Sequence, residues 1–193
     1  MNKRDLQAKQ TREKLVHTSK QLITKYGYNQ VSVSRICQEC KIAKGTFYIY
    51  FTSKKDIIHE ILADINILMF SRKWNLSGTA RQRLEEYTHT YLEMIQLQGM
   101  DFTREALKIM MDEKIEYKTV YADKHIDMVE GILNDGKAAG EIDQALDVAF
   151  FRRGLQNMFF GIMLDWCSSR LEIPVIEFGE RTIQGWMKLI FKV

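Results

Sequence analysis

Apolar residues recur along most of the chain at the three- and four-residue spacing of helices that bury one face. Alternating runs rich in valine and threonine are almost absent, and Pro174 is the only proline. The breaks between the apolar stripes coincide with residues that stop helices, such as Gly99, Gly140 and Pro174. The pattern predicts an all-α chain with nine helices, over residues 5–26, 32–39, 43–50, 54–74, 79–98, 102–114, 118–139, 146–170 and 175–191.

The stretch from Val31 to Lys55 has the pattern of two short helices joined by a tight turn. Ser32 is suited to cap the first helix with its hydroxyl group, and Phe47 and Phe51 mark the inward face of the second. The other sides of the second helix carry Lys44, Thr46, Tyr48 and Tyr50. A helix this short is marginal alone, so the pattern favours a surface that docks in a DNA major groove. An ordinary helical hairpin with solvated lysine and tyrosine is the alternative.

Charge is divided unevenly along the chain. Residues 1–60 hold 12 Lys and Arg against 5 Asp and Glu, a net charge of +7, whereas residues 61–193 hold 16 against 20, a net charge of −4. A basic N-terminal third is favourable for binding a polyanion. The basic residues that lead into the first helix would sit on phosphates or form a solvated tail; they are Lys3, Arg4, Lys9, Arg12 and Lys14.

Several aromatic, apolar and glycine positions occur at fixed spacing in the first third of the chain. They are Leu15, Val16, Leu22, Ile23, Gly27 and Tyr28, the stretch from Ser32 to Cys40, the stretch from Lys44 to Phe51, and the stretch from Ser53 to Ile57. With these residues, the run from Thr11 to Leu62 resembles the DNA-binding domain of the tetracycline-repressor (TetR) family of bacterial regulators. A weaker match from Gly136 to Ile142 is similar to that family's turn into its dimerisation helices.

The resemblance implies a helix-turn-helix DNA-binding domain over residues 1–53 and an effector-binding and dimerisation domain over residues 54–193. It implies a ligand-responsive, sequence-specific regulator, most simply a repressor that a small apolar or amphipathic effector releases from an inverted-repeat operator on double-stranded DNA. A DNA-binding protein of the same fold without a small-molecule effector is the alternative. The implied DNA contacts are Ser34, Arg35, Lys44, Gly45, Thr46, Tyr48, Tyr50 and Lys54.

The chain departs from the family pattern in the turn between the two short helices. Lys41 stands where the family usually has glycine, so a non-glycine residue is expected to adopt the left-handed conformation there. Cys37 and Cys40 occupy positions that alanine commonly fills. None of these departures removes a group that faces DNA.

The eighth predicted helix is apolar on nearly all sides, so more than one side must be covered. A partner subunit related by twofold symmetry is an economical cover. Gly154, Gly161 and Ser168, seven residues apart, keep one face small enough for a close helix crossing. The pattern is similar to the family's four-helix interface and predicts a homodimer built on Gly154, Met158, Gly161, Ile183, Trp186 and Met187. A central core helix in a monomer is the alternative.

Nine of the ten methionines fall at or after Met69, among aromatic residues. Because methionine adapts its shape to irregular apolar partners, this composition suits an effector cavity among the fourth to eighth helices. The predicted lining residues are Met69, Tyr91, Met110, Phe159, Met163 and Trp166. Plain core packing is the alternative for each of them.

Other chemistry has little support. Cys37 and Cys40 have the spacing of a metal or redox pair, but they lie within a predicted helix and have no second pair nearby. Catalytic triads, phosphate-binding loops and paired carboxylates are not apparent, so we expect neither enzymatic activity nor a cofactor or metal. A secretory segment and a membrane-spanning run are also not apparent, so we expect a cytoplasmic protein with reduced cysteines.

Overall fold

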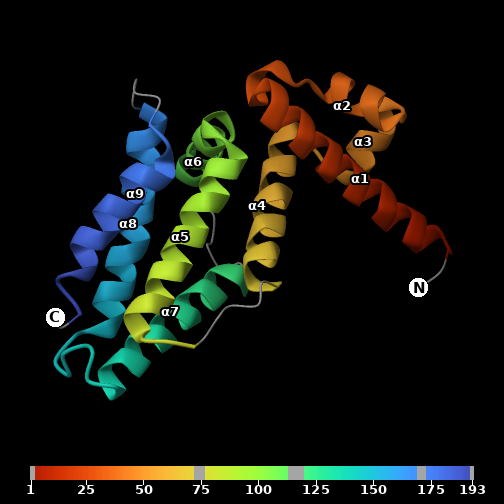
Figure 1. Ribbon diagram of the computed structural model, residues 1–193. Helices are drawn as coiled ribbons and strands as arrows, with labels where there is room; N and C mark the ends of the chain where they lie inside the picture. Colours follow the sequence, from red (N-terminus) through yellow and green to blue (C-terminus); the bar gives the residue numbers. More distant parts are fainter. Residues whose placement is uncertain (1–2, 72–76, 113–119, 169–172, 192–193) are drawn as a thin grey trace.

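The computed structural model describes residues 3–71, 77–112, 120–168 and 173–191, which are mostly helical (Figure 1). The helices are α1 (Lys3–Tyr26), the short 3-10 helix η1 (Tyr28–Gln30), α2 (Val33–Cys40), α3 (Lys44–Tyr50), α4 (Lys54–Ser71), α5 (Ala80–Gln98), α6 (Met100–Asp112), α7 (Val120–Ala138), α8 (Val148–Ser168) and α9 (Val175–Met187). Over the described residues, extended pairing is limited to an isolated antiparallel bridge between Ile142 and Phe191. The predicted all-α fold is therefore confirmed, with helix ends that differ by a few residues.

The N-terminal domain packs α1, α2, α3 and the first turns of α4 around one apolar core. Phe47 of α3, Ile36 of α2 and Ile57 of α4 are fully buried there. The same core also contains Phe102 and Ala106 of α6, which are distant in sequence. Figure 1 shows α1–α3 on one side of α4 and α5–α9 on the other.

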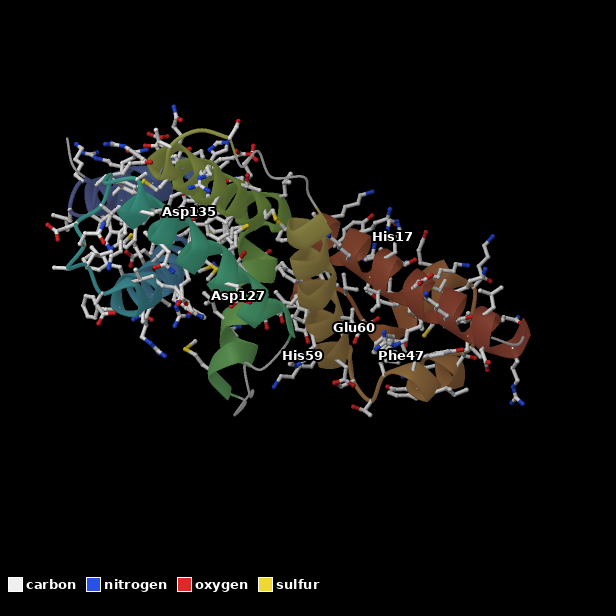
Figure 2. All side chains as sticks on the ribbon, turned by 90° about the horizontal axis from the view of Figure 1, so that it is seen from below. His17, Phe47, His59, Glu60, Asp127 and Asp135 are labelled. Atoms are coloured by element: carbon white, nitrogen blue, oxygen red, sulfur yellow. The ribbon has the colours of Figure 1, made fainter. Side chains whose placement is uncertain are left out.

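The C-terminal domain packs α5, α7, α8 and α9 around a second core. The approach of α5 and α9 is close at Gly179: an added Cβ atom would lie 2.6 Å from a methyl carbon of Leu92. Arg83 of α5 donates to the carboxylate of Asp135 on α7 at 2.8 Å, which joins the two helices at the edge of this core (Figure 2).

Two helices connect the domains. The helix α4 begins in the N-terminal core and continues until it contacts α7. The helix α6 is the second connection, because Phe102 lies in the N-terminal core and Leu107 lies in the C-terminal core. In addition, Arg104 Nη2 donates to the carbonyl oxygen of Cys167 on α8 at 2.9 Å. A shift of α8 relative to α6 can therefore be transmitted to the N-terminal domain.

The helix ends have local causes. Gly99 and Gly140 adopt positive φ angles of 82° and 76°, as expected of glycines that stop helices. The last helix ends at Met187, whereas the sequence predicts its end at residue 191. The chain turns after Met187, and this turn buries Phe191 where it pairs with Ile142.

Candidate nucleic-acid interface

The turn between α2 and α3 is fixed by backbone hydrogen bonds. Ser32 Oγ accepts from the Arg35 backbone N–H at 3.1 Å, which confirms the predicted N-terminal cap of α2. Lys41 has φ 55° and ψ 45°, so the predicted left-handed conformation is confirmed. The N–H of Ile42 then donates to the carbonyl oxygen of Cys37 at 3.0 Å. These bonds set the direction in which α3 leaves α2.

The helix α3 has one anchored face and one open face. Phe47 is fully buried and its ring centroid lies 5.7 Å from that of Phe51, so the two rings hold α3 against the domain (Figure 2). Lys44 and Gly45 are exposed, and a Cβ atom added at Gly45 would meet nothing within 4 Å. Tyr48 is half exposed, at 50%. The open face thus presents a cation, bare backbone and a phenol.

The other predicted DNA contacts on these helices are less open. Thr46 and Tyr50 are half-buried, and Tyr50 packs against the N-terminal core. Ile49 is 77% exposed, although the sequence pattern did not select it. An apolar side chain projecting from this face can contact the methyl group of thymine.

Ser34 is exposed on α2, and Arg35 is half-buried beside it. The Arg35 guanidinium carbon lies 3.9 Å from the ring centroid of Tyr26, at the end of α1. The ammonium nitrogen of Lys25 lies 5.1 Å from the same centroid. Tyr26 therefore orients Arg35 through a cation–π contact. Residue spacing could not predict this pair, because the two residues lie on different helices.

Lys54, a predicted DNA contact, also makes contacts within the chain. Its ammonium nitrogen donates to the carbonyl oxygen of Tyr28 at 2.7 Å and to that of Val31 at 2.8 Å. It also lies 3.7 Å from the Tyr28 ring centroid, and burial lowers the pKa of Lys54. Two carbonyl groups accept from the ammonium group, so Lys54 positions η1 and the start of α2; its contact with DNA stays a prediction.

The start of α4 is capped by an acidic residue of its own first turn. Asp56 Oδ2 accepts from the backbone N–H groups of Thr52 at 2.7 Å and Ser53 at 3.1 Å. Burial alone would raise the pKa of Asp56, but the hydrogen bonds from the backbone and hydroxyl groups of Thr52 and Ser53 lower it overall. This cap fixes the junction between α3 and α4.

The predicted effector residues lie largely in the packed C-terminal core. The ring centroids of Tyr91 and Phe159 are 4.2 Å apart, and Met163 is buried in the same core. Trp166 is also buried, and its Nε1–H donates to the carbonyl oxygen of Ile173 at 3.1 Å. The side chains of Met69 and Met110 lie outside the described residues. In this conformation the four described side chains serve as core.

The predicted dimer residues divide into two groups. Ile183 and Met187 are buried in the chain's own core, so their side chains are not available to a partner. Gly154, Met158 and Trp186 are half-buried, and Gly161 is exposed with nothing within 4 Å of an added Cβ atom. Large apolar side chains that the prediction did not include are exposed on the same two helices or just beyond α9: Phe150, Leu164, Phe178 and Leu189.

Cys37 and Cys40 are buried in the N-terminal core, and burial raises the pKa of the Cys37 thiol. Over the described residues, no three His, Cys, Asp or Glu side chains gather where they could hold a metal ion. Among the described helices, none combines the length and hydropathy that crossing a membrane requires.

Comparison with known proteins points to the same surface. Residues 15–61 match the family described as bacterial regulatory proteins, tetR family. The chain is 38% identical over 68 residues to the uncharacterized HTH-type transcriptional regulator YuxN of Bacillus subtilis, an alignment that spans 35% of this chain and 23% of YuxN. It is 24% identical over 175 residues to the HTH-type transcriptional regulator UidR of Escherichia coli, spanning 86% of each chain.

Solved structures share the whole fold. A TetR-family transcriptional regulator (ECA1819) from Pectobacterium atrosepticum aligns with a TM-score of 0.80 at 13% identity, over 100% of this chain and 99% of the other. The transcriptional regulator FadR from Bacillus subtilis in complex with stearoyl-CoA aligns with a TM-score of 0.62 at 18% identity, over 89% and 95% of the two chains. Because the sequence identities are this low, the likeness to these structures shows a shared fold alone.

The fold and the α2–turn–α3 surface define a helix-turn-helix DNA-binding regulator of transcription, not an enzyme. Residues 15–61 belong to the tetR family of bacterial regulatory proteins, and the chain as a whole shares the fold of a solved TetR-family regulator.

Proposed function

We propose that the protein is a repressor that binds an inverted-repeat operator and leaves it when a small apolar or amphipathic effector binds. The observation that supports this proposal best is the two-sided character of α3. Phe47 and Phe51 fix its inner face, while Lys44, Gly45 and Tyr48 remain on an open surface. A helix of this kind reads base edges when it lies in the major groove.

Each residue of the open surface has a chemical role in this proposal. Lys44 and Thr46 contact base edges, and the bare backbone at Gly45 allows the helix to approach them closely. Tyr48, Tyr50 and Ser34 donate hydroxyl hydrogen bonds to phosphates. Arg35, oriented by the Tyr26 ring, adds a charged phosphate contact (3.9 Å from guanidinium carbon to ring centroid).

A homodimer formed through α8 and α9 would bring two such surfaces to one operator. The support is the row of exposed apolar side chains on or beside these helices, with Gly161 offering a close crossing point. Twofold symmetry then sets two recognition helices about one helical turn of DNA apart, roughly 34 Å or a multiple of it. The operator is therefore an inverted repeat, and the dimer acts in the cytoplasm where that DNA is found.

The effector would separate the packed rings of Tyr91 and Phe159 and occupy the space among α4, α5 and α8. The complex of FadR with stearoyl-CoA supports an amphipathic occupant. Insertion there displaces α4 and the junction of α6 with α8, where Arg104 donates to the Cys167 carbonyl. Both helices enter the N-terminal core, so the two recognition surfaces change their separation. Linkage requires effector and operator to weaken each other's binding equally, typically by about 5 to 150-fold.

A regulator of the same fold without a small-molecule effector is the second candidate. The contact of Tyr91 with Phe159, at 4.2 Å between centroids, supports it, because these two packed rings occupy space in the described part of the core that an effector would need. Thermal unfolding across a panel of acyl and aromatic compounds separates the two candidates. A rise in Tm for one compound class supports the effector, and a panel without any rise supports the second candidate.

Selection of bound duplexes from a random pool tests the proposal as a whole. The proposal predicts enrichment of one inverted repeat, and calorimetry with that duplex then measures effector affinity with and without operator. Equal affinities in the two titrations would contradict the proposed release mechanism.

A further inference from the structure

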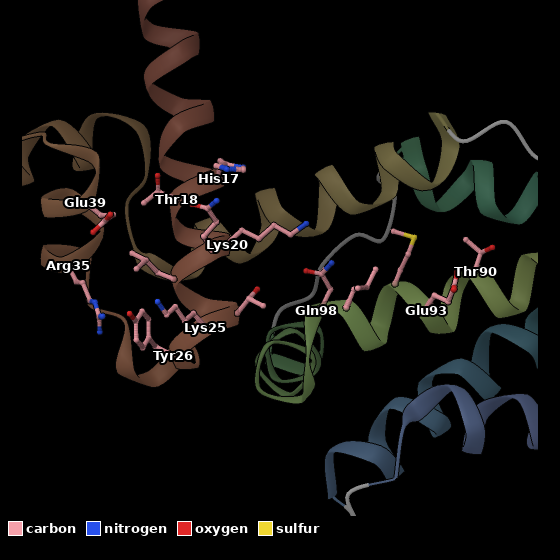
Figure 3. Close-up of a pocket in the computed structure, with 15 residues that line it drawn as sticks. His17, Thr18, Lys20, Lys25, Tyr26, Arg35, Glu39, Thr90, Glu93 and Gln98 are labelled. Atoms are coloured by element: carbon pink, nitrogen blue, oxygen red, sulfur yellow. The ribbon is translucent and has the colours of Figure 1, made fainter.

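A groove of about 910 Å³ lies between α1 and α5, at the edges of the two cores (Figure 3). Figure 3 shows side chains of α1 and α2 on one wall and side chains of α5 on the other. The lining of the groove includes Lys20, Lys25, Tyr26 and Arg35 on one wall and Met94 and Leu97 on the other. None of them except Arg35 belongs to the DNA surface, and none lines the effector space proposed among α4, α5 and α8.

The α1 wall is cationic and aromatic. Lys25 and Arg35 both lie against the Tyr26 ring, at 5.1 Å and 3.9 Å from its centroid. Lys20 adds a third cation to the lining, and Glu39 is the carboxylate on this wall. Three cations against one carboxylate make this wall favourable for an anionic group.

The α5 wall is apolar with unused polar atoms. Leu97 is 74% exposed at the groove, and Met94 lies one turn before it. Thr90 is only 3% exposed, and its hydroxyl oxygen has no hydrogen-bond partner within the described part of the chain. The same is true of the side-chain oxygen Oε1 of Gln98. A buried polar atom without a partner costs stability, so two of them on one wall point to a ligand that supplies the partner.

Glu93 is the carboxylate on the α5 wall, but another residue partly compensates it. Its Oε1 lies 3.4 Å from Nε2 of His89 on the same helix. The groove as a whole therefore keeps an excess of positive charge on the α1 side and apolar surface on the α5 side.

We propose that this groove binds a small organic anion, with its carboxylate or sulfonate on Lys20 and its apolar part on Met94 and Leu97, while Lys25 and Arg35 add positive charge at the far end of the groove (Figure 3). The volume of the groove lies within the range of small-molecule sites, roughly 300–1,000 Å³. The flexible side chain of Met94 accommodates either an aromatic or a short acyl body.

The position of the groove gives the site a consequence for DNA binding, which rests on the proposed function. One wall belongs to the N-terminal domain and the other to the C-terminal domain, so an occupant fixes their relative orientation. Anion and operator therefore change each other's binding by the same factor.

Binding of 8-anilinonaphthalene-1-sulfonate, an aromatic anion with an environment-sensitive fluorescence, tests the site without DNA. Saturable binding to the full chain is expected. Leu97→Glu places a negative charge, like that of the probe, at the groove. It should lower the affinity for the probe about tenfold or more, a change of about 1.4 kcal/mol. The double change Lys20→Ala, Lys25→Ala removes two cations and lowers the affinity about fivefold or more at low salt.

Matched controls are available on the same molecule. Met111 of α6 is exposed like Leu97, and Lys14 is exposed on α1 away from the groove, so Met111→Glu and Lys14→Ala should leave the probe affinity unchanged. Equal affinities for the wild type and both groove variants would overturn the proposal, as would the absence of saturable binding. Because these measurements contain no DNA, their outcome does not depend on whether the proposed operator binding is correct. Addition of the probe to an operator complex, once one is found, tests the regulatory consequence alone.

Discussion

The ammonium nitrogen of Lys54 lies 3.7 Å from the centroid of the Tyr28 ring and donates to the Tyr28 carbonyl oxygen at 2.7 Å. This side chain joins the start of α4 to η1, and its second bond, to the carbonyl oxygen of Val31, reaches the residue before the α2 cap. Since α4 continues into the C-terminal domain, Lys54 lies where a displacement of α4 would first reach the elements that carry the DNA surface.

Replacement of Lys54 by methionine should destabilise the protein even without DNA. The variant keeps the aliphatic stem but leaves two carbonyl groups without their donor, which costs about 1–3 kcal/mol in the free energy of unfolding. Urea denaturation monitored by circular dichroism measures the difference. Lys44→Met, at an exposed lysine, is the control and should leave stability almost unchanged. A Lys54→Met variant as stable as the wild type would contradict this structural role. If that variant also bound DNA more weakly, Lys54 would act only as a DNA contact.

Gly179→Ala should loosen the packing of α9 on α5. The new methyl group would lie 2.6 Å and 2.9 Å from the two methyl carbons of Leu92, which is fully buried and has no room to move. Overpacking of this kind costs about 1–3 kcal/mol. Gly131→Ala on α7 has open space around the new methyl group and should stabilise its helix by about 0.5–1 kcal/mol. Thermal unfolding of the two variants should therefore shift Tm in opposite directions, and equal shifts would contradict the packing described for Gly179.

The contact of His89 on α5 with Glu180 on α9 should make stability depend on pH. The hydrogen bond to Glu180, together with the charge of Glu93, raises the pKa of His89 above its ordinary 6.5 in the folded state. The contribution of this contact to the free energy of unfolding is therefore fully present below about pH 6.5. It is lost as the pH rises through the pKa of His89 in the folded state. His89→Gln should lower the free energy of unfolding more at about pH 5.5 than at about pH 9.

The effect at His89 should be small and sensitive to salt, because both side chains are nearly half exposed. His17→Gln, at an exposed histidine of α1, is the control. An equal pH dependence in the two variants would show that the contact between His89 and Glu180 does not form in solution.

Gly161→Glu tests the proposed homodimer. Gly161 is exposed and its surroundings are open, so a single chain tolerates the side chain, whereas a close crossing by a partner helix does not. We expect the variant to sediment as a monomer and to lose tight operator binding at the same time. Gly131→Glu, at an equally open helical glycine on α7, should keep the dimer. A wild-type protein that is monomeric at micromolar concentration but binds the operator normally would contradict the dimer.

Local signals in the sequence predicted the helices and the turn between α2 and α3. The Ser32 cap and the left-handed Lys41 depend on residues close in sequence, so they could be inferred before the structure was known. The end of α9 at Met187 was missed because Phe191 pairs with Ile142, about fifty residues earlier, and no local pattern reports such a pairing.

Contacts between distant helices decided the roles that the sequence could not assign. Lys54 lies at a helix start beside the recognition helix, which is the usual place of a phosphate contact, and only the fold brings the Tyr28 and Val31 carbonyl groups to it. The contribution of Phe102 to the N-terminal core and the contact of Tyr26 with Arg35 could not be predicted either, because both join separate helices. Helical spacing identified Ile183 and Met187 as apolar face residues, but it could not say whether the chain's own core or a partner covers that face.

The most direct test of the account is the operator affinity of the double variant Lys44→Ala, Tyr48→Ala, measured by fluorescence anisotropy on the selected inverted repeat. Both side chains lie on the open face of α3, and because the Tyr48 ring also lies edge-on to Phe47, at 5.3 Å between centroids, circular dichroism should first establish that the variant folds like the wild type. We expect the loss of these contacts in two half-sites to weaken specific binding about 100-fold or more. The affinity of Lys188→Ala, at an exposed lysine beyond α9, should not change by more than about twofold. Full operator affinity in the double variant would contradict the assignment of α3 as the DNA-reading helix.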